Sequence, residues 1–295
     1  MNFKKIISYA MSFLLVISLG ACSSTENLNN NENKTANREP VIISTSVAVT
    51  EILDSLDIKL KGVPTTIYNL PEGTKDAVKV GSPMNPDLEI IKSLNPTVVV
   101  SVDTLGDDFK NIFIENNIPS EFVTLTSLNG LKETIDKLGN KFNKKDEADK
   151  ILSTIVSKEN EIIKAHKGEE KPKVLIVFSA PGSLMIGTDK CYLGSLIDAI
   201  GAENLIKNNK SPFVPINMEE IVKLNPDKVL VMTHGDPETS KVMAKNELTT
   251  NPMWQRVIAV KNNKVEYLDS EYFGMSANLK VNNALDMLDK TLYNN

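Results

Sequence analysis

Histidine is the scarcest chemically versatile residue in this sequence. The 295 residues contain two histidines, His166 and His234. Zinc and manganese sites use several clustered histidines and carboxylates, so this shortage argues against them. We also find no Ser/His/Asp or Cys/His arrangement and no Gly-rich phosphate loop. The sequence therefore predicts a binding protein that is not an enzyme.

Cysteine and arginine are equally rare. The cysteines are Cys22 and Cys191, and the arginines are Arg38 and Arg256. If Cys22 carries a lipid anchor, as argued below, Cys191 is the one cysteine left over in the mature chain, so we expect no intrachain disulfide. The formal net charge of −5 argues against a nucleic-acid partner. After Cys22, no apolar run is long enough to cross a membrane.

The first 39 residues have the composition of a targeting segment and a tether. Two lysines precede an apolar run over residues 6–19, which leads through small residues to Cys22. This order resembles a bacterial lipobox, so we expect a signal peptide over residues 1–21 and acylation of Cys22. The anchor would hold the protein at the outer face of the cytoplasmic membrane in the Gram-positive manner. A plain signal peptide with a chance cysteine is the alternative. Residues 22–39 are polar and predict a flexible tether that includes the lipid anchor.

Two segments repeat one pattern. One begins at Leu88 and reads LEIIKSLNPTVVVSV, and the other begins at Met218 and reads MEEIVKLNPDKVLVM. Each is typical of a short amphipathic helix, an Asn-Pro turn and a β-branched strand. Each half of the chain also opens with a strand followed by a helix. The alternation predicts an α/β fold of two Rossmann-like lobes with mainly parallel sheets.

A charged segment separates the two halves. Residues 144–167 contain no proline, and their apolar residues recur at helical spacing. We therefore expect one long connecting helix within residues 144–170. It would join an N-terminal lobe, residues 40–143, to a C-terminal lobe, residues 171–295.

His234 follows directly after a predicted strand over residues 229–232. Ligands of open α/β sheets bind beyond the carboxyl ends of the strands, so we expect His234 to face a cleft between the lobes. Met84 lies in the loop Gly-Ser-Pro-Met-Asn-Pro, after a predicted strand of the other lobe. Imidazole nitrogen and thioether sulfur suit soft or borderline metals, and they form an axial pair on haem iron. A polar surface histidine and a packing methionine are the structural alternatives.

His166 and Cys191 lie outside these motifs. We expect His166, between Lys164 and Lys167, to be solvated. We expect Cys191 to begin a helix and to pack inward. A thiol that instead faced the cleft would compete for iron.

Several stretches resemble the substrate-binding lipoproteins of ATP-binding-cassette (ABC) importers with a helical backbone between the lobes. They are STSVAVTEILDSLD, VGSPMNPDLEIIKSLNPTVVVSV, APGSLMIGTDKCYLGSLIDAIGAENLI, THGDPE and FGMSAN, all within residues 41–293. Within this group they are similar to the haem-binding lipoproteins of the iron-regulated surface determinant system of Gram-positive bacteria. The resemblance implies haem as the transported ligand, with Met84 and His234 as axial ligands of its iron.

A haem pocket also needs apolar walls and groups that hold two propionates. Backbone N–H and hydroxyl groups at the start of the first helix suit a propionate, and a Pro-Gly-Ser turn would do the same from the other lobe. The resemblance places residues 272–275 near the haem, and ordinary core packing of their aromatic pair is the alternative. The predicted pocket residues are Thr45, Ser46, Val47, Ala48, Gly182, Ser183, Tyr272, Phe273 and Met275.

Glu89 and Glu219 occupy equivalent positions in the repeated helices. The resemblance implies that they dock onto arginines of two permease subunits, and a solvated helix face is the alternative. The implied partners are an ABC permease dimer with its ATPase, a haem donor at the cell surface, and the membrane through Cys22. We expect a monomer that delivers haem to the importer.

Three other functions remain open. The same fold with a ferric siderophore or a cobalamin would leave Met84 and His234 without a shared role, and an anionic siderophore would favour arginines in the cleft. An extracytoplasmic metal-dependent hydrolase that used His234 with Asp236 would lack further metal ligands. A sensor or adhesin built on a binding-protein fold would lack genomic neighbours encoding a permease and an ATPase.

Overall fold

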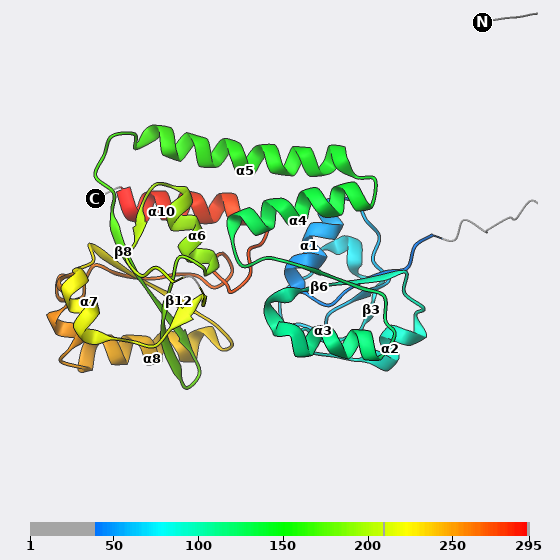
Figure 1. Ribbon diagram of the computed structural model, residues 1–295, viewed down its shortest axis with the longest axis horizontal. Helices are drawn as coiled ribbons and strands as arrows, with labels where there is room; N and C mark the ends of the chain where they lie inside the picture. The colour runs from blue at the N-terminus through cyan, green and yellow to red at the C-terminus, as the bar shows by residue number, and fades with distance from the viewer. Residues whose placement is uncertain (1–38, 209, 294–295) are drawn as a thin grey trace, which may run out of the picture. The chain divides into compact units, whose positions relative to one another are not determined.

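The computed structural model describes residues 39–208 and 210–293 (Figure 1). The predicted signal peptide, Cys22 and the tether up to Arg38 lie outside the described residues. From Pro40 onward the chain forms one compact unit, so the lobe boundaries at residues 143 and 171 stay predictions. No helix of the described part is long and apolar enough to cross a membrane.

The first half of this unit contains an entirely parallel five-stranded sheet with the order β3-β2-β1-β6-β7. The interior strand β6 is buried along its whole length, as expected for a Val-rich strand covered on both faces. The strands are β1 (Ile42–Ser44), β2 (Gly62–Val63), β3 (Val78–Lys79), β6 (Val98–Val102) and β7 (Ser120–Val123).

Four helices and a small hairpin complete this half. The hairpin of β4 (Gly81–Ser82) and β5 (Asn85–Pro86) follows β3 directly, where the sequence predicts a loop. The helices are α1 (Val47–Ser55), α2 (Leu88–Ser93), α3 (Gly106–Glu115) and α4 (Leu128–Lys141).

The second half contains a mainly parallel six-stranded sheet. Its order is β11-β9-β8-β12-β13, with β10 beside the start of β8. Strands β8, β10, β12 and β13 pair in parallel, whereas β9 pairs antiparallel with both of its neighbours, β8 and β11. The strands are β8 (Lys173–Ala180), β9 (Ser183–Gly187), β10 (Glu203–Asn204), β11 (Phe213–Val214), β12 (Lys228–Thr233) and β13 (Val265–Tyr267).

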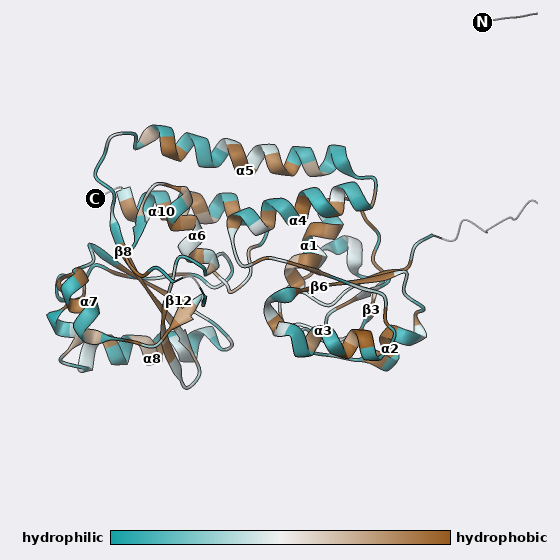
Figure 2. Ribbon diagram, viewed as in Figure 1, coloured by the Kyte–Doolittle hydropathy of each residue, from teal (hydrophilic) through white to brown (hydrophobic). Residues whose placement is uncertain are grey.

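Helices cover this second sheet. Hydrophobic residues gather on β6, β8 and β12, while the outer helix faces are hydrophilic (Figure 2). The helices are α6 (Tyr192–Ala199), α7 (Met218–Leu224), α8 (Pro237–Thr250), α9 (Ile258–Lys261) and α10 (Val281–Tyr293).

The predicted long helix is confirmed as α5 (Lys145–Ala165), and it lies beside α4 and α10 (Figure 1). Its buried residues Ala148, Ile155 and Ile162 recur every two turns and form one apolar stripe. Further contacts join the halves: the amide of Leu128 donates to Ser195 Oγ at 2.9 Å, and the amide of Ala277 donates to Leu125 O at 2.7 Å. The connection is therefore a layer of packed helices and crossing segments.

The prediction that His166 is solvated is wrong. Its side chain is 15% exposed, with Nδ1 2.9 Å from Glu169 and Nε2 2.6 Å from Asp289. Its ring stacks on Tyr293 with centroids 3.8 Å apart. Burial acts to lower the pKa of His166, but hydrogen bonds to the two carboxylates outweigh it and raise the pKa. Asp289 and Tyr293 belong to α10, so His166 ties the end of α5 to that helix.

Candidate functional site

Met84 lies at the tip of the β4–β5 hairpin. Pro83 and Met84 are the two loop residues between the paired Ser82 and Asn85. The side chain of Met84 is 73% exposed, so its thioether is open to a ligand. A methionine that packs in the core would be buried, so the structure does not favour the packing alternative for Met84.

The base of this hairpin is tightly built. Gly81 has φ +89°, and a Cβ there would lie 2.5 Å from the amide nitrogen of Asp87. Only glycine fits such a close approach in this conformation. The carboxylate of Asp87 accepts hydrogen bonds from the amides of Glu89 and Ile90 and so caps α2. The cap fixes the hairpin that carries Met84 to the start of a helix.

His234 follows the carboxyl end of β12, as the sequence predicts. Its amide donates to Ser179 O at 2.9 Å, and its carbonyl accepts from Ser240 Oγ at 3.1 Å. Ser240 is fully buried, and its own carbonyl accepts from Ser179 Oγ at 2.8 Å. The backbone of His234 is therefore held on both sides.

The residues after His234 turn the chain sharply into α8. Gly235 adopts φ +78°, a conformation that favours glycine. Asp236 then caps α8, accepting from the amide of Thr239 at 3.2 Å and from its hydroxyl at 2.7 Å. The carboxylate of Asp236 is thus engaged in the cap, which does not favour a hydrolase in which it acts with His234.

The imidazole of His234 is exposed, and its ring centroid lies 6.3 Å from that of Phe178. Phe178 packs in turn against Phe213 with centroids 4.3 Å apart. Desolvation by the surrounding protein lowers the pKa of His234 from its ordinary value. The ring is consequently neutral at neutral pH, and a neutral ring has a nitrogen lone pair for a metal.

The predicted propionate site at the start of α1 is mostly buried: Thr45, Ser46 and Ala48 are buried, and Val47 is half-buried. The Thr45 hydroxyl is buried and donates to Ser101 Oγ at 2.7 Å. Ser46 is the N-cap residue, but its side chain makes no capping hydrogen bond to α1. The first-turn amides of Val47 and Ala48 therefore have no side-chain cap, and α1 keeps the partial positive charge of its N-terminus.

The other predicted pocket residues divide by exposure. Gly182 has φ +74° and forms an exposed turn with Pro181 between β8 and β9, followed by half-buried Ser183. Tyr272 is half-buried and Met275 is 36% exposed. Phe273 is fully buried in the apolar core, so it offers no open face, which favours the core-packing alternative for this residue.

Cys191 begins α6 and packs inward, as expected. Its sulfur accepts from the amide of Gly194 at 3.3 Å and lies 3.1 Å from the carbonyl of Thr188. Burial raises the pKa of the thiol to about 12. Cys191 therefore stays a neutral thiol in the core.

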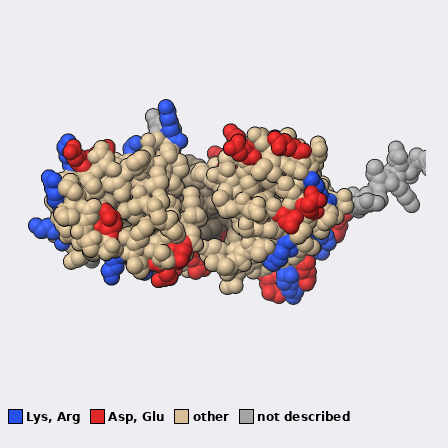
Figure 3. Space-filling view, turned by 90° about the horizontal axis from the view of Figure 1, so that it is seen from below, with Lys and Arg blue, Asp and Glu red and all other residues tan. Residues whose placement is uncertain are grey.

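The described residues offer no group of three or more His, Cys, Asp or Glu side chains arranged to hold a metal ion. Figure 3 shows the side of the molecule seen from below, which is hollowed between the parts that contain the two sheets. Most atoms around the hollow belong to uncharged residues. With few charged groups around it, this hollow offers few carboxylates to a bare metal ion.

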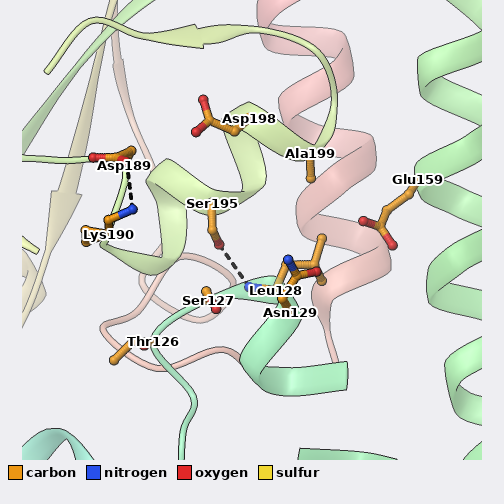
Figure 4. A pocket seen from close by; sticks show the side chains of 10 residues that line it. All are labelled: Thr126, Ser127, Leu128, Asn129, Glu159, Asp189, Lys190, Ser195, Asp198 and Ala199. Atoms are coloured by element: carbon orange, nitrogen blue, oxygen red, sulfur yellow. Dashed lines mark hydrogen bonds and ion pairs between the residues drawn. The ribbon is translucent and has the colours of Figure 1, made fainter. Parts of the chain in front are cut away.

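A separate cavity of about 530 Å³ lies between α4 and α6 and contains none of the predicted ligand residues (Figure 4). Its carboxylates already have cationic partners. Asp189 lies 3.0 Å from Lys190, and Glu159 lies 2.8 Å from Lys132. Asp198 is likewise paired at 3.0 Å with Lys207. With its charges neutralised internally, this cavity is not a candidate ligand site.

The profile of the periplasmic binding protein family matches residues 42–272. The chain belongs to this family. The high-affinity heme uptake system protein IsdE of Staphylococcus aureus is 37% identical over 290 residues, which cover 98% of each chain. The predicted fold class and the predicted group of binding proteins, which are not enzymes, are confirmed.

Solved structures agree with this family. The crystal structure of S. aureus IsdE complexed with heme has a TM-score of 0.82 and 38% identity, covering 86% of this chain and 99% of that one. An ABC transporter substrate-binding protein from Listeria monocytogenes EGD-e has a TM-score of 0.83 and 39% identity, covering 88% and 100%. The periplasmic heme binding protein HutB of Vibrio cholerae is 23% identical with a TM-score of 0.71, which supports the fold alone.

Proposed function

We propose that this chain is the haem-binding component of an ABC importer that takes up haem from outside the cytoplasmic membrane. Its similarity to IsdE along 98% of both chains is the observation that carries the proposal. The fold similarity to the IsdE complex with heme supports it further, with a TM-score of 0.82. Binding and delivery need no catalytic step, in keeping with the lack of a catalytic arrangement.

Met84 and His234 are the proposed axial ligands of the haem iron. His234 follows the parallel strand β12 of one sheet, and Met84 lies on the hairpin that follows the parallel strand β3 of the other. Both side chains are exposed, and His234 is neutral at neutral pH. A sulfur and a nitrogen ligand on opposite faces would fix the porphyrin plane without any carboxylate.

The start of α1 is the proposed propionate site. Because its first-turn amides lack a side-chain cap, they are free to donate to a carboxylate. Gly182 and Ser183 would approach from the β8–β9 turn, and Tyr272 and Met275 would supply apolar surface. Arg256, the arginine among the described residues, belongs to the 3-10 helix Trp254–Arg256, so backbone amides are the proposed propionate donors.

Glu89 and Glu219 are the proposed docking contacts with the two permease subunits. Each is the second residue of its helix, α2 or α7, and each is exposed to solvent. Glu89 lies 3.6 Å from Lys92, a weak exposed pair that an arginine of a partner would displace at little cost. One glutamate in each half matches a partner with two-fold symmetry.

Cys22 is the proposed lipid anchor, and the protein would act as a monomer that takes haem from a donor at the cell surface. The permease would work with an ATPase, as in other ABC importers. The anchor lies outside the described residues. Mass spectrometry of the mature protein would test it, because acylation adds the mass of the lipid chains to Cys22.

Haem titration is the test of this function. The chain from Glu26 onward keeps the whole compact unit and would be titrated with haemin beside Met84→Ala and His234→Ala. We expect saturation at one haem per chain, with a low-spin absorption spectrum that changes in each variant.

Other outcomes would separate the parts of the proposal. A wild-type chain without saturable haem binding would refute haem as the ligand, and ferric siderophores and cobalamin would be titrated next. Haem bound identically by both variants would keep the ligand but refute both axial assignments.

A further inference from the structure

Met84 is the most exposed methionine of residues 39–208 and 210–293. Its side chain is 73% exposed, against 36% for Met275 and 36% for Met287. The other methionines of this part of the chain are half-buried or buried: Met185, Met218, Met232, Met243 and Met253. A small reagent in solution therefore reaches the sulfur of Met84 more easily than that of any other methionine described.

The β4–β5 hairpin keeps this thioether exposed. At its tip, the amide of Asn85 donates to Ser82 Oγ at 3.2 Å, and at its base, the amide of Asp87 donates to Val80 O at 2.8 Å. The proline before Met84 restricts the backbone further. Because tip and base are both held, Met84 cannot turn into the core without breaking the pairing of β4 with β5.

Cys191 does not compete with Met84 for an oxidant. The thiolate is the reactive form of cysteine, and burial suppresses it. Cys191 is 3% exposed, and burial raises the pKa of its thiol to about 12. It is also the one free cysteine within the described residues. An oxidant that meets this part of the protein therefore finds exposed thioethers and no accessible thiolate.

We propose that the Met84 thioether is a modification site at which hydrogen peroxide converts the haem-free protein into a form that binds haem weakly. This inference rests on the proposed function. One peroxide oxygen bonds to the sulfur while the O–O bond breaks, and the other oxygen leaves as water with both hydrogens. The sulfur is oxidised by two electrons, the peroxide is reduced, and the product is methionine sulfoxide.

The sulfoxide lacks the donor that the proposed site uses. A thioether offers a soft sulfur lone pair to iron, whereas a sulfoxide has given one of its lone pairs to oxygen and presents a hard oxygen instead. His234 would remain as the one proposed axial ligand. Because sulfoxide reductases restore the thioether, the change is reversible. The exposure that opens Met84 to haem thus opens it to peroxide as well.

Peroxide treatment of the haem-free chain from Glu26 onward would test this site. After catalase has removed the peroxide, peptide mass spectrometry would locate the added oxygen, and a haemin titration would measure the affinity. We expect Met84 to be oxidised about 2-fold faster than Met287, in line with their exposed fractions. Haem affinity should then fall about 10-fold, and reductases for both sulfoxide epimers should restore it.

Two leucine variants assign the loss of affinity to one sulfur. Met84→Leu keeps an apolar side chain of similar volume without sulfur. It should bind haem more weakly than wild type, and peroxide should weaken it no further. Met287→Leu is the matched control, because it removes another exposed thioether, on α10. It should lose haem affinity on peroxide treatment as wild type does.

The remaining outcomes overturn the inference in different ways. Oxidation that is no faster at Met84 than at Met287, in a chain that binds haem, would refute the modification site and leave the proposed function intact. Unchanged affinity after full oxidation of Met84, with weak binding by untreated Met84→Leu, would refute the sulfoxide as the weakly binding form. A further loss in peroxide-treated Met84→Leu would assign the effect to another residue. Untreated wild type without saturable haem binding would refute the proposed function itself.

Discussion

The two histidines of this chain occupy opposite environments. His166 is mostly buried between two carboxylates and a tyrosine ring, and its pKa is raised. His234 is exposed, its ring lies near that of Phe178, and its pKa is lowered. The comparison separates a histidine whose nitrogens are used inside the fold from one whose nitrogens remain available. The partners of the ring, rather than the residue type, decide between structure and ligand binding.

Haem affinity should separate the two histidines most strongly. We expect His234→Ala to weaken haem binding by more than about 100-fold, because it removes an iron ligand and not merely an outer contact. His166→Ala should leave haem affinity unchanged, because its ring lies in the α5–α10 contact. Competition between the protein and a scavenger for haemin would measure both affinities. A large loss of haem affinity in His166→Ala would contradict the distinction between the two histidines.

The free energy of unfolding should depend more on His166 than on His234. His166→Ala should lower the free energy of unfolding by about 1–3 kcal/mol, because it leaves the partly buried Asp289 carboxylate without its partner. His234→Ala should change it by less than about 0.5 kcal/mol, because the imidazole is exposed. Urea denaturation of the chain without haem would measure both values.

The two histidines should respond to pH in opposite directions. The stability that His166 contributes should fall as pH rises, whereas the haem affinity that depends on His234 should fall as pH decreases. A raised folded pKa means that His166 stabilises the fold fully below about pH 6.5 and loses this contribution as pH rises through the folded value. The stability difference between wild type and His166→Gln should therefore shrink from about pH 5.5 to about pH 8.5. Urea denaturation at both pH values would show it, and a difference that grew would reverse the assignment.

At His234 the lowered pKa acts in the opposite direction. Proton competition for the imidazole should begin only as pH falls below the ordinary histidine value of about 6.5. Haem affinity should thus stay constant from neutral pH down to that point and then fall. Haemin titrations across this pH range would measure the affinity. An affinity that already fell with decreasing pH above neutrality would contradict the lowered pKa of His234.

The smallest effect concerns the two carboxylates at His166. Asp289 is closer to the ring and less exposed than Glu169, so its charge is less screened. We expect Asp289→Asn to lower the pKa of His166 more than Glu169→Gln does. NMR titration of the imidazole protons would rank them, and the opposite order would assign the larger role to Glu169.

Local patterns predicted the parts of the structure that depend on sequence neighbours. The strand before His234, the helix over residues 145–165 and the capped start of α6 at Cys191 all follow from periodicity and from single residues. The β4–β5 hairpin was not predicted, because Pro83-Met84 lacks the usual turn glycine of a two-residue loop.

Contacts between distant residues account for what the sequence did not reveal. His166 lies 123 residues from Asp289, and no helical period connects them. Ser240 locks the carbonyl of His234 through a tertiary contact that leaves no sequence signal. The burial of Phe273 likewise depends on packing across the chain, which no local pattern reveals.

The locked backbone of His234 also bears on the kinetics of release. Because its amide and carbonyl are both engaged, the imidazole can move only by rotation about its own side-chain torsions. Met84 is held in a similar way, because Gly81 and the Asp87 cap fix the base of its hairpin. If both residues hold the haem iron as proposed, neither side chain can follow a departing ligand beyond the reach of its own torsions. Release would then require whole segments of the protein to move.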